Sequence, residues 1–106
     1  MDYFSQRRKG CEAEFTRNQE HAFRITARRN RLFGLWAAVR LGLKDDAALT
    51  YAGRVMDADF AAPGDQDVIE KARSDLVDKG IAVTEGDLRV DLARATLEAR
   101  RQLSPP

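Results

Sequence analysis

Residues 32–41 read LFGLWAAVRL, an apolar run that is broken only by Arg40. On a helix, such a run presents apolar side chains on almost every side, as expected of an element that other helices surround. Nothing from Glu12 to Phe33 is Gly or Pro, so the helical pattern extends far toward the N-terminus. We therefore expect one long helix from about Tyr3 to Leu41, with Gly42 as its C-terminal stop.

Three shorter helices are predicted after this one. Asp45 or Asp46 can cap a second helix that continues through Phe60 and is broken by Pro63-Gly64. Asp65 is the predicted N-cap of the third helix. The apolar positions of these two helices recur at spacings of three and four. The predicted stripes are Leu49, Ala52, Met56 and Phe60 in the second helix, and Ile69, Ala72 and Leu76 in the third.

The fourth helix follows Gly80, which ends the third. Thr84 with Asp87 three residues later resembles a capping box, and Pro105-Pro106 cannot continue the helix. Its predicted apolar stripe is Leu88, Leu92, Ala95, Ala99 and Leu103. The chain is therefore predicted to be all-α, a four-helix bundle in a single domain of 106 residues.

Length sets the first helix apart from the others. About 39 helical residues span roughly 60 Å, whereas helices of about 15 to 20 residues span roughly 25–30 Å. The bundle cannot cover all of the first helix, so we expect its N-terminal part to project or to be mobile. We divide the chain into an N-terminal docking arm, residues 1–17, and a bundle domain, residues 18–106. The arm keeps Tyr3, Phe4 and Phe15 beside Arg7-Arg8-Lys9, a combination that favours docking into a groove.

Charge is distributed unevenly, although the net charge is only +1. Up to Arg31 the chain has eight basic and four acidic residues, and from Leu32 onward it has ten basic and thirteen acidic residues. A basic segment is attracted to nucleic acid, lipid headgroups, phosphate or an acidic protein groove. The apolar run is too short to span a bilayer, and the single Cys11 fits a reducing compartment. We expect a cytoplasmic protein that does not insert into the membrane.

Residue types that support catalysis or metal binding are scarce. A phosphate-binding loop is absent, and one histidine with one cysteine cannot form a structural zinc site. The pairs Asp57-x-Asp59 and Asp65-x-Asp67 lack the third ligand and the glycine of a calcium loop. His21 is predicted to be a surface residue and Cys11 a small residue on the apolar side of its helix. We expect neither an enzyme nor a metal site.

An arginine face is the remaining candidate site. Arg17, Arg24, Arg28 and Arg31 fall close together on the first helix, with His21 beside them. This face either pairs with acidic residues of the body, for instance near Asp57 or Asp75, or binds phosphate, since guanidinium groups match phosphate oxygens well. Arg29 lies instead on the apolar side, so it should snorkel or meet a carboxylate from another helix.

The segment from Ala27 to Ala38, ARRNRLFGLWAA, resembles the signature of the ATPase inhibitor subunit zeta family of bacterial F-type ATP synthases. The resemblance covers most of the chain and thins after about Gly80. Further matching segments are Phe15, Phe23-Arg24, Tyr51-Ala52, Ala58-Asp59-Phe60, residues 64–68, Lys71 and Asp75-Leu76.

The resemblance implies a non-catalytic protein that binds the catalytic head of the ATP synthase on its cytoplasmic side and inhibits ATP hydrolysis. It implies that the N-terminal segment enters an interface of alpha and beta subunits next to the rotor subunit gamma. The implied contact residues are Asp2, Tyr3, Phe4, Arg7, Arg8, Lys9, Phe15 and Arg17. Gly10 lies within this arm and is a poor helix former, so it weakens the helical preference of the arm.

Two alternatives remain open beside this reading. The face of Arg17, Arg24, Arg28 and Arg31 would also serve a helical protein that binds nucleotides or nucleic acid. Arg24, Arg28 and Arg31 are then the candidate phosphate contacts. Against nucleic acid, the body is acidic and no recognition-helix pattern is evident. We expect no cofactor, with weak adenine-nucleotide binding as the possibility to test.

Overall fold

The computed structural model describes residues 2–61 and 64–104, and within them the side chains of residues 17–59 and 64–104. The described chain is built from four α-helices and contains no strand. The helices are α1 (Asp2–Arg40), α2 (Asp45–Ala61), α3 (Asp65–Asp78) and α4 (Glu85–Leu103). The predicted all-α, four-helix fold is confirmed.

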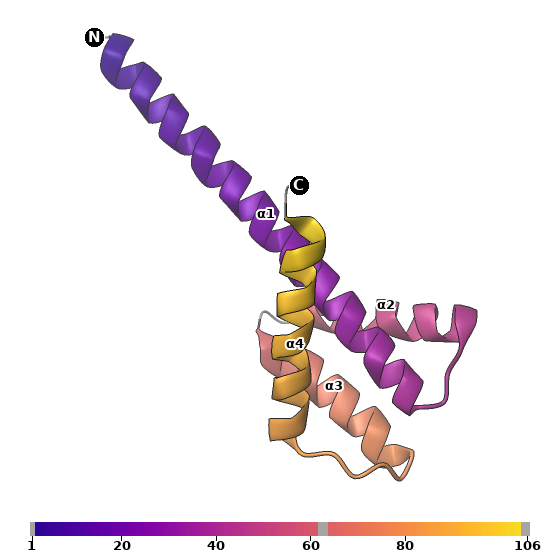
Figure 1. The fold of residues 1–106 in the computed structure, drawn as a ribbon. Helices are drawn as coiled ribbons and strands as arrows, with labels where there is room; N and C mark the ends of the chain where they lie inside the picture. Colours follow the sequence, from indigo (N-terminus) through magenta and orange to yellow (C-terminus); the bar gives the residue numbers. More distant parts are fainter. Residues whose placement is uncertain (1, 62–63, 105–106) are drawn as a thin grey trace.

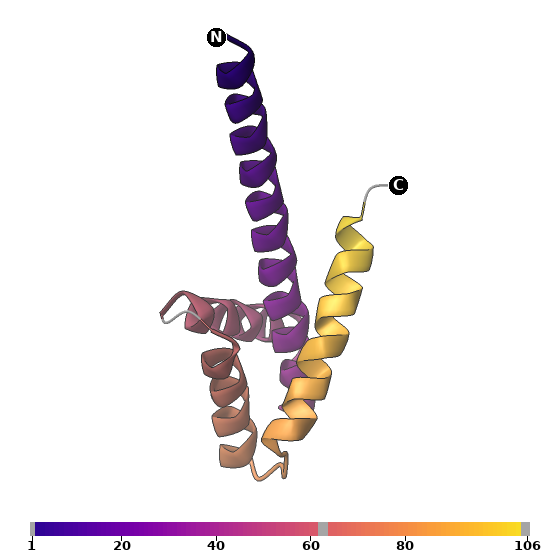
Figure 2. The ribbon, with the colours of Figure 1, turned by 90° about the vertical axis from the view of Figure 1, so that its left-hand side faces the viewer.

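The long first helix projects from the bundle (Figure 1). Its C-terminal part lies among the other helices, whereas its N-terminal part extends well beyond them in both views (Figures 1 and 2). The molecule accordingly measures 66 × 29 × 22 Å along its principal axes. The predicted projection of the first helix is confirmed, and α1 runs without a break across the proposed boundary after Arg17. The boundary between arm and bundle stays a prediction.

The other helices pack against α1 at different angles, and α3 runs nearly parallel to it in both views (Figures 1 and 2). In Figures 1 and 2, α4 runs back along α1 in the broadly opposite direction, and α2 lies across the C-terminal part of α1. The core lies where the four helices meet. The largest of its fully buried side chains are Phe33, Val55, Val68, Ile69, Leu76 and Leu88. The predicted stripes of the third and fourth helices are buried as expected, except that Leu103 is only half-buried.

The buried face of α2 differs in part from the predicted one. Ala52 is buried as predicted, and Tyr51 and Val55 also lie in the core, whereas Leu49 is 50% exposed and Met56 is half-buried. Both sets of residues have spacings of three and four, so the period alone could not choose between faces one residue apart. The choice falls on Tyr51 because its hydroxyl finds a carboxylate, Asp75, across the helix interface. The side chain of Phe60 lies outside the described residues.

Helix ends follow the predicted punctuation, except that the predicted caps of α2 and α3 are wrong. The Thr84–Asp87 capping box is present in both directions, and Gly42 and Gly80 have positive φ angles of 79° and 84°. The N-cap of α3 is Gly64, with φ 129°, and not Asp65 as predicted. Asp65 is instead the first helical residue, and its carboxylate pairs with Arg29. Asp45 and Asp46 likewise lie in the first turn of α2.

Gly34 lets α1 and α2 approach closely. A Cβ atom at this position would lie 2.8 Å from the Ala52 Cα and 3.2 Å from the Val55 Cβ. Contact at 2.8 Å with a backbone atom cannot be relieved by rotating a side chain. The glycine inside the apolar run is therefore required by the packing of the two helices.

Candidate functional site

The side chains of α1 change from exposed to buried along the helix. Residues 17–24 are exposed, residues 25–29 are half-buried, and Asn30 is the first buried residue of the described part. The helix therefore leaves the bundle near residue 25 and carries at least eight exposed positions beyond it. This exposed part, with the arm that precedes it, is the candidate partner-binding surface.

The side chains of the predicted contact residues in the arm lie outside the described residues, with the exception of Arg17. They are Asp2, Tyr3, Phe4, Arg7, Arg8, Lys9 and Phe15, together with Cys11. Arg17 is exposed on α1. The role of these residues in binding stays a prediction.

The arginine face lies on the surface of α1. Arg17, Arg24 and Arg31 are exposed, and the half-buried Arg28 donates from Nη1 to the Gln102 Oε1 at 2.7 Å. No ion pair holds any of these four arginines within the described side chains. The expected pairing with the acidic body near Asp57 or Asp75 is therefore not found there. The positive charge of this face stays available to a partner.

Asp75 is unavailable because two other groups occupy its carboxylate. The Tyr51 hydroxyl donates to its Oδ2 at 2.8 Å, and the Lys71 Nζ lies 2.9 Å from the same oxygen. Lys71 also lies 5.7 Å from the centroid of the Tyr51 ring, within cation–π range. This cluster joins α2 to α3.

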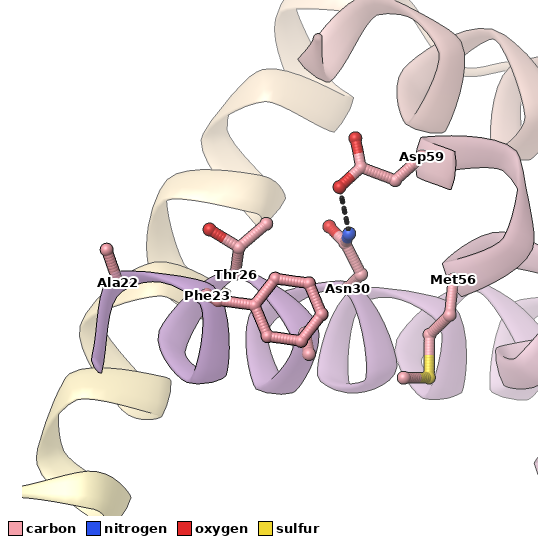
Figure 3. A pocket seen from close by; sticks show the side chains of 7 residues that line it. Ala22, Phe23, Thr26, Asn30, Met56 and Asp59 are labelled. Atoms are coloured by element: carbon pink, nitrogen blue, oxygen red, sulfur yellow. Dashed lines mark hydrogen bonds between the residues drawn. The ribbon is translucent and has the colours of Figure 1, made fainter. Parts of the chain in front are cut away.

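A polar network anchors the projecting helix at its point of exit. Arg29 pairs with Asp65 of α3 at 3.0 Å, and its side chain is only 11% exposed. Its Nε and Nη2 also donate to the Asn30 Oδ1 at 3.1 and 2.9 Å. The Asn30 Nδ2 donates to the Asp59 Oδ2 of α2 at 2.9 Å (Figure 3). The predicted meeting of Arg29 with a carboxylate is confirmed, and the network ties α1 to both α2 and α3.

The partnership of Asn30 with Asp59 was not predicted. The signal for it was the position of Asn30 just before the apolar run, where a buried amide needs partners. For Asp59, the sequence indicates only half of a weak metal-binding pair and a place in a segment that carries the family resemblance. Within the described residues, no group of three or more His, Cys, Asp or Glu side chains is placed to hold a metal ion.

A pocket of about 200 Å³ lies between α1 and α2, beside this network (Figure 3). Its lining residues are Ala22, Phe23, Thr26, Ala27, Asn30, Met56 and Asp59. The only charged side chain among them is Asp59, and Arg24, Arg28 and Arg31 do not line the pocket. A carboxylate repels phosphate and no cation lines this pocket, so among the described residues the pocket and the arginine face do not combine into a nucleotide site.

Burial raises the pKa of the Tyr51 hydroxyl above its ordinary value, and the hydrogen bond to Asp75 raises it further. A raised pKa in the folded protein means that folding favours the neutral form of the hydroxyl. The stabilisation is therefore fully present below the unfolded pKa of about 10 and is lost as the pH rises toward the folded pKa.

Tyr51→Phe is expected to lower the free energy of unfolding at pH 7 by about 1–2 kcal/mol, because it removes a hydrogen bond to a charged acceptor. The alkaline loss of stability should also become smaller in this variant. Urea unfolding between pH 7 and pH 11 measures both effects. Equal stability of the two proteins at pH 7 would show that the bond contributes nothing.

None of the described helices is long and apolar enough to cross a membrane. The fold and the surface together define a class, a small all-α protein whose long first helix projects beyond the bundle. The family model named ATPase inhibitor subunit zeta matches residues 1–102. The chain belongs to this family, and the match extends past Gly80, where the resemblance thins. A search of curated proteins found no match to the sequence.

Several residues that carry the family resemblance have structural roles in this fold. Arg29 and Asn30 join the anchoring network, and Gly34 allows the close contact of α1 with α2. Asp59 and Asp65 accept from that network on the other helices. Part of the most specific stretch of the sequence therefore holds α1 in place where it leaves the bundle.

Proposed function

We propose that this protein binds the catalytic head of an F-type ATP synthase and inhibits ATP hydrolysis. The arm, residues 1–17, inserts at an interface of alpha and beta subunits near the rotor subunit gamma. One structural observation carries the proposal: α1 is continuous and projects beyond a bundle that anchors its other end. Membership of the ATPase inhibitor subunit zeta family supports the identity of the target.

The mechanism requires no chemistry from this chain. A catalytic interface must change conformation to hydrolyse ATP, and a helix that binds one conformation more tightly shifts the population toward it. The helix acts as a wedge in the interface, and the bundle remains outside because it is too wide to follow. We propose that the protein works on the cytoplasmic side of the membrane-bound enzyme, without a cofactor and without binding nucleic acid.

The anchoring network gives the wedge its stiffness. Arg29 with Asp65 and Asn30 with Asp59 hold α1 to two other helices just before it leaves the bundle. A wedge held in this way loses less conformational entropy on docking than a flexible tail would lose. The anchor therefore supports an inhibitory helix that is aimed by the bundle.

The exposed arginines of α1 are expected to contribute to binding. Arg17 and Arg24 are exposed and have no ion pair among the described side chains, so an acidic surface would meet uncompensated charge. Arg17→Glu combined with Arg24→Glu is expected to weaken binding of the full-length protein to the purified catalytic head by about 10-fold, mainly through a slower association.

The matched control is Arg54→Glu combined with Arg73→Glu, which changes the net charge equally on α2 and α3. Both arginines are exposed and lack ion pairs within the described part of the chain. Binding kinetics of the two double variants, measured at two salt concentrations, show which arginines matter for association. Equal weakening by both would mean that overall charge, and not the face of α1, governs association.

A further inference from the structure

A second concave surface lies on the bundle, away from the arm. It is a groove of about 440 Å³ between α4 and the neighbouring parts of α1 and α3. Arg29 and Asp65 form one side, and Ala93, Leu97 and Arg100 of α4 form the other. Leu97 is 66% exposed, which is unusual for a leucine beside a groove. The proposed wedge mechanism leaves this groove unused.

The groove carries excess positive charge. Arg29 is paired with Asp65 at 3.0 Å, and Arg89 is paired with Glu85 at 2.9 Å. Arg100 is exposed, and within residues 17–59 and 64–104 no carboxylate pairs with it. A partner that brought a carboxylate to this end of the groove would find a cation without a counter-charge.

The spacing of the α4 residues suits a helix as the occupant. Ala93, Leu97 and Arg100 are four and three residues apart, so they form one ridge along the exposed side of α4. Ridges of this kind pack into the grooves of a second helix. An amphipathic helix lying here would cover Leu97 with an apolar side chain and place an acidic one beside Arg100.

The groove is continuous with the proposed docking surface. The hydrogen bond from Arg28 to Gln102, 2.7 Å long, holds the C-terminal end of α4 beside the exit of α1. The end of α4 overlaps α1 in Figure 1 but slants away from it in Figure 2, so this side-chain bond is what links the two helices there. A partner that grips residues 17–24 therefore lies next to the groove.

We propose that this groove is a second docking surface, which receives an acidic amphipathic helix on the outer surface of the same catalytic head. The proposal rests on the proposed function, because it names the same partner. A single unpaired arginine beside an exposed leucine suits a protein helix, whereas nucleic acid calls for many phosphate contacts from cations.

The test is the affinity of the full-length variant Leu97→Ser, Arg100→Glu for the purified catalytic head. Its matched control is Leu49→Ser, Arg54→Glu, in which a 50% exposed leucine and an exposed, unpaired arginine of α2 change identically. We expect the groove variant to bind about 10-fold more weakly and the control to bind within about 2-fold of the unchanged protein. Inhibition at saturation should be equal in all three, and urea unfolding verifies that both variants fold.

The outcomes separate the two proposals. If the unchanged protein binds and inhibits but the groove variant has the same affinity, the groove is not an interface and the proposed function stands. If the unchanged protein does not bind the head, the proposed function fails and the assignment of the groove fails with it. Binding of random duplex DNA that is lost in the groove variant would also overturn the assignment, since the occupant would then be nucleic acid.

Discussion

Gly34→Val is expected to lower the free energy of unfolding by about 3 kcal/mol, at the upper end of the usual range for overpacked cores. The reason is the crossing of α1 and α2, where an added Cβ would lie 2.8 Å from the Ala52 Cα. The backbone of α2 must shift to admit it, and the branched side chain adds further contacts with Val55. Gly34→Ala should destabilise less, by about 1–2 kcal/mol, because alanine recovers about 1 kcal/mol of helix propensity.

Gly53→Ala is the control for this prediction. Gly53 also lies within a helix, α2, but nothing lies within 4 Å of a Cβ added there. The substitution should therefore stabilise the protein by about 0.5–1 kcal/mol through helix propensity alone. Urea unfolding followed by circular dichroism measures all three variants. If Gly34→Ala stabilised the protein as Gly53→Ala does, the close crossing of the helices would be refuted.

Asn30→Ala is expected to destabilise the protein by about 2–3 kcal/mol, since it removes buried hydrogen bonds on both sides of the side chain. Asn30 is 2% exposed, accepts twice from Arg29 and donates to Asp59. Asp59 would be left half-buried without its donor. Among the described side chains, Arg29 would keep the ion pair with Asp65.

Asn18→Ala provides the comparison on the same helix. Asn18 is exposed, so its replacement should change stability by less than about 1 kcal/mol, in the stabilising direction because alanine is the better helix former. A double-mutant cycle with Asp59→Ala isolates the pair, and we expect a coupling of about 1 kcal/mol or more. Additive effects of Asn30→Ala and Asp59→Ala would mean that the bond between them does not anchor α1.

The sequence predicts local features of this fold well. Thr84 and Asp87 carry their capping signal within four residues. The position of Arg29 on an apolar face predicts that it snorkels or meets a carboxylate, and in the structure it meets Asp65. Features that depend on the neighbouring helix are harder to predict. The period of α2 is compatible with either Leu49 or Tyr51 inside, and the outcome depends on Asp75, which lies on α3.

The candidate site, like the fold, can be predicted in part from the sequence. A first helix too long for its bundle already indicates a projecting segment, and Figure 1 bears this out. The anchoring pair of Asn30 and Asp59 joins residues that are 29 positions apart, and no local pattern indicates it. The role of Asp65 was equally hard to predict from local sequence. Its side chain suits an N-cap, but Gly64 occupies that position and Asp65 forms an ion pair with Arg29 instead.

The central claim is that the projecting part of α1 is the inhibitory element and that the bundle positions it. The most direct test is ATP hydrolysis by a matching purified catalytic head, titrated with the full-length protein and with residues 18–106. The buried residues of the described chain lie between Asn30 and Ala99, so the shortened protein should still fold. We predict that the full-length protein inhibits and that residues 18–106 do not. Equal inhibition by the two proteins would contradict the claim, since the bundle alone would then be the inhibitor.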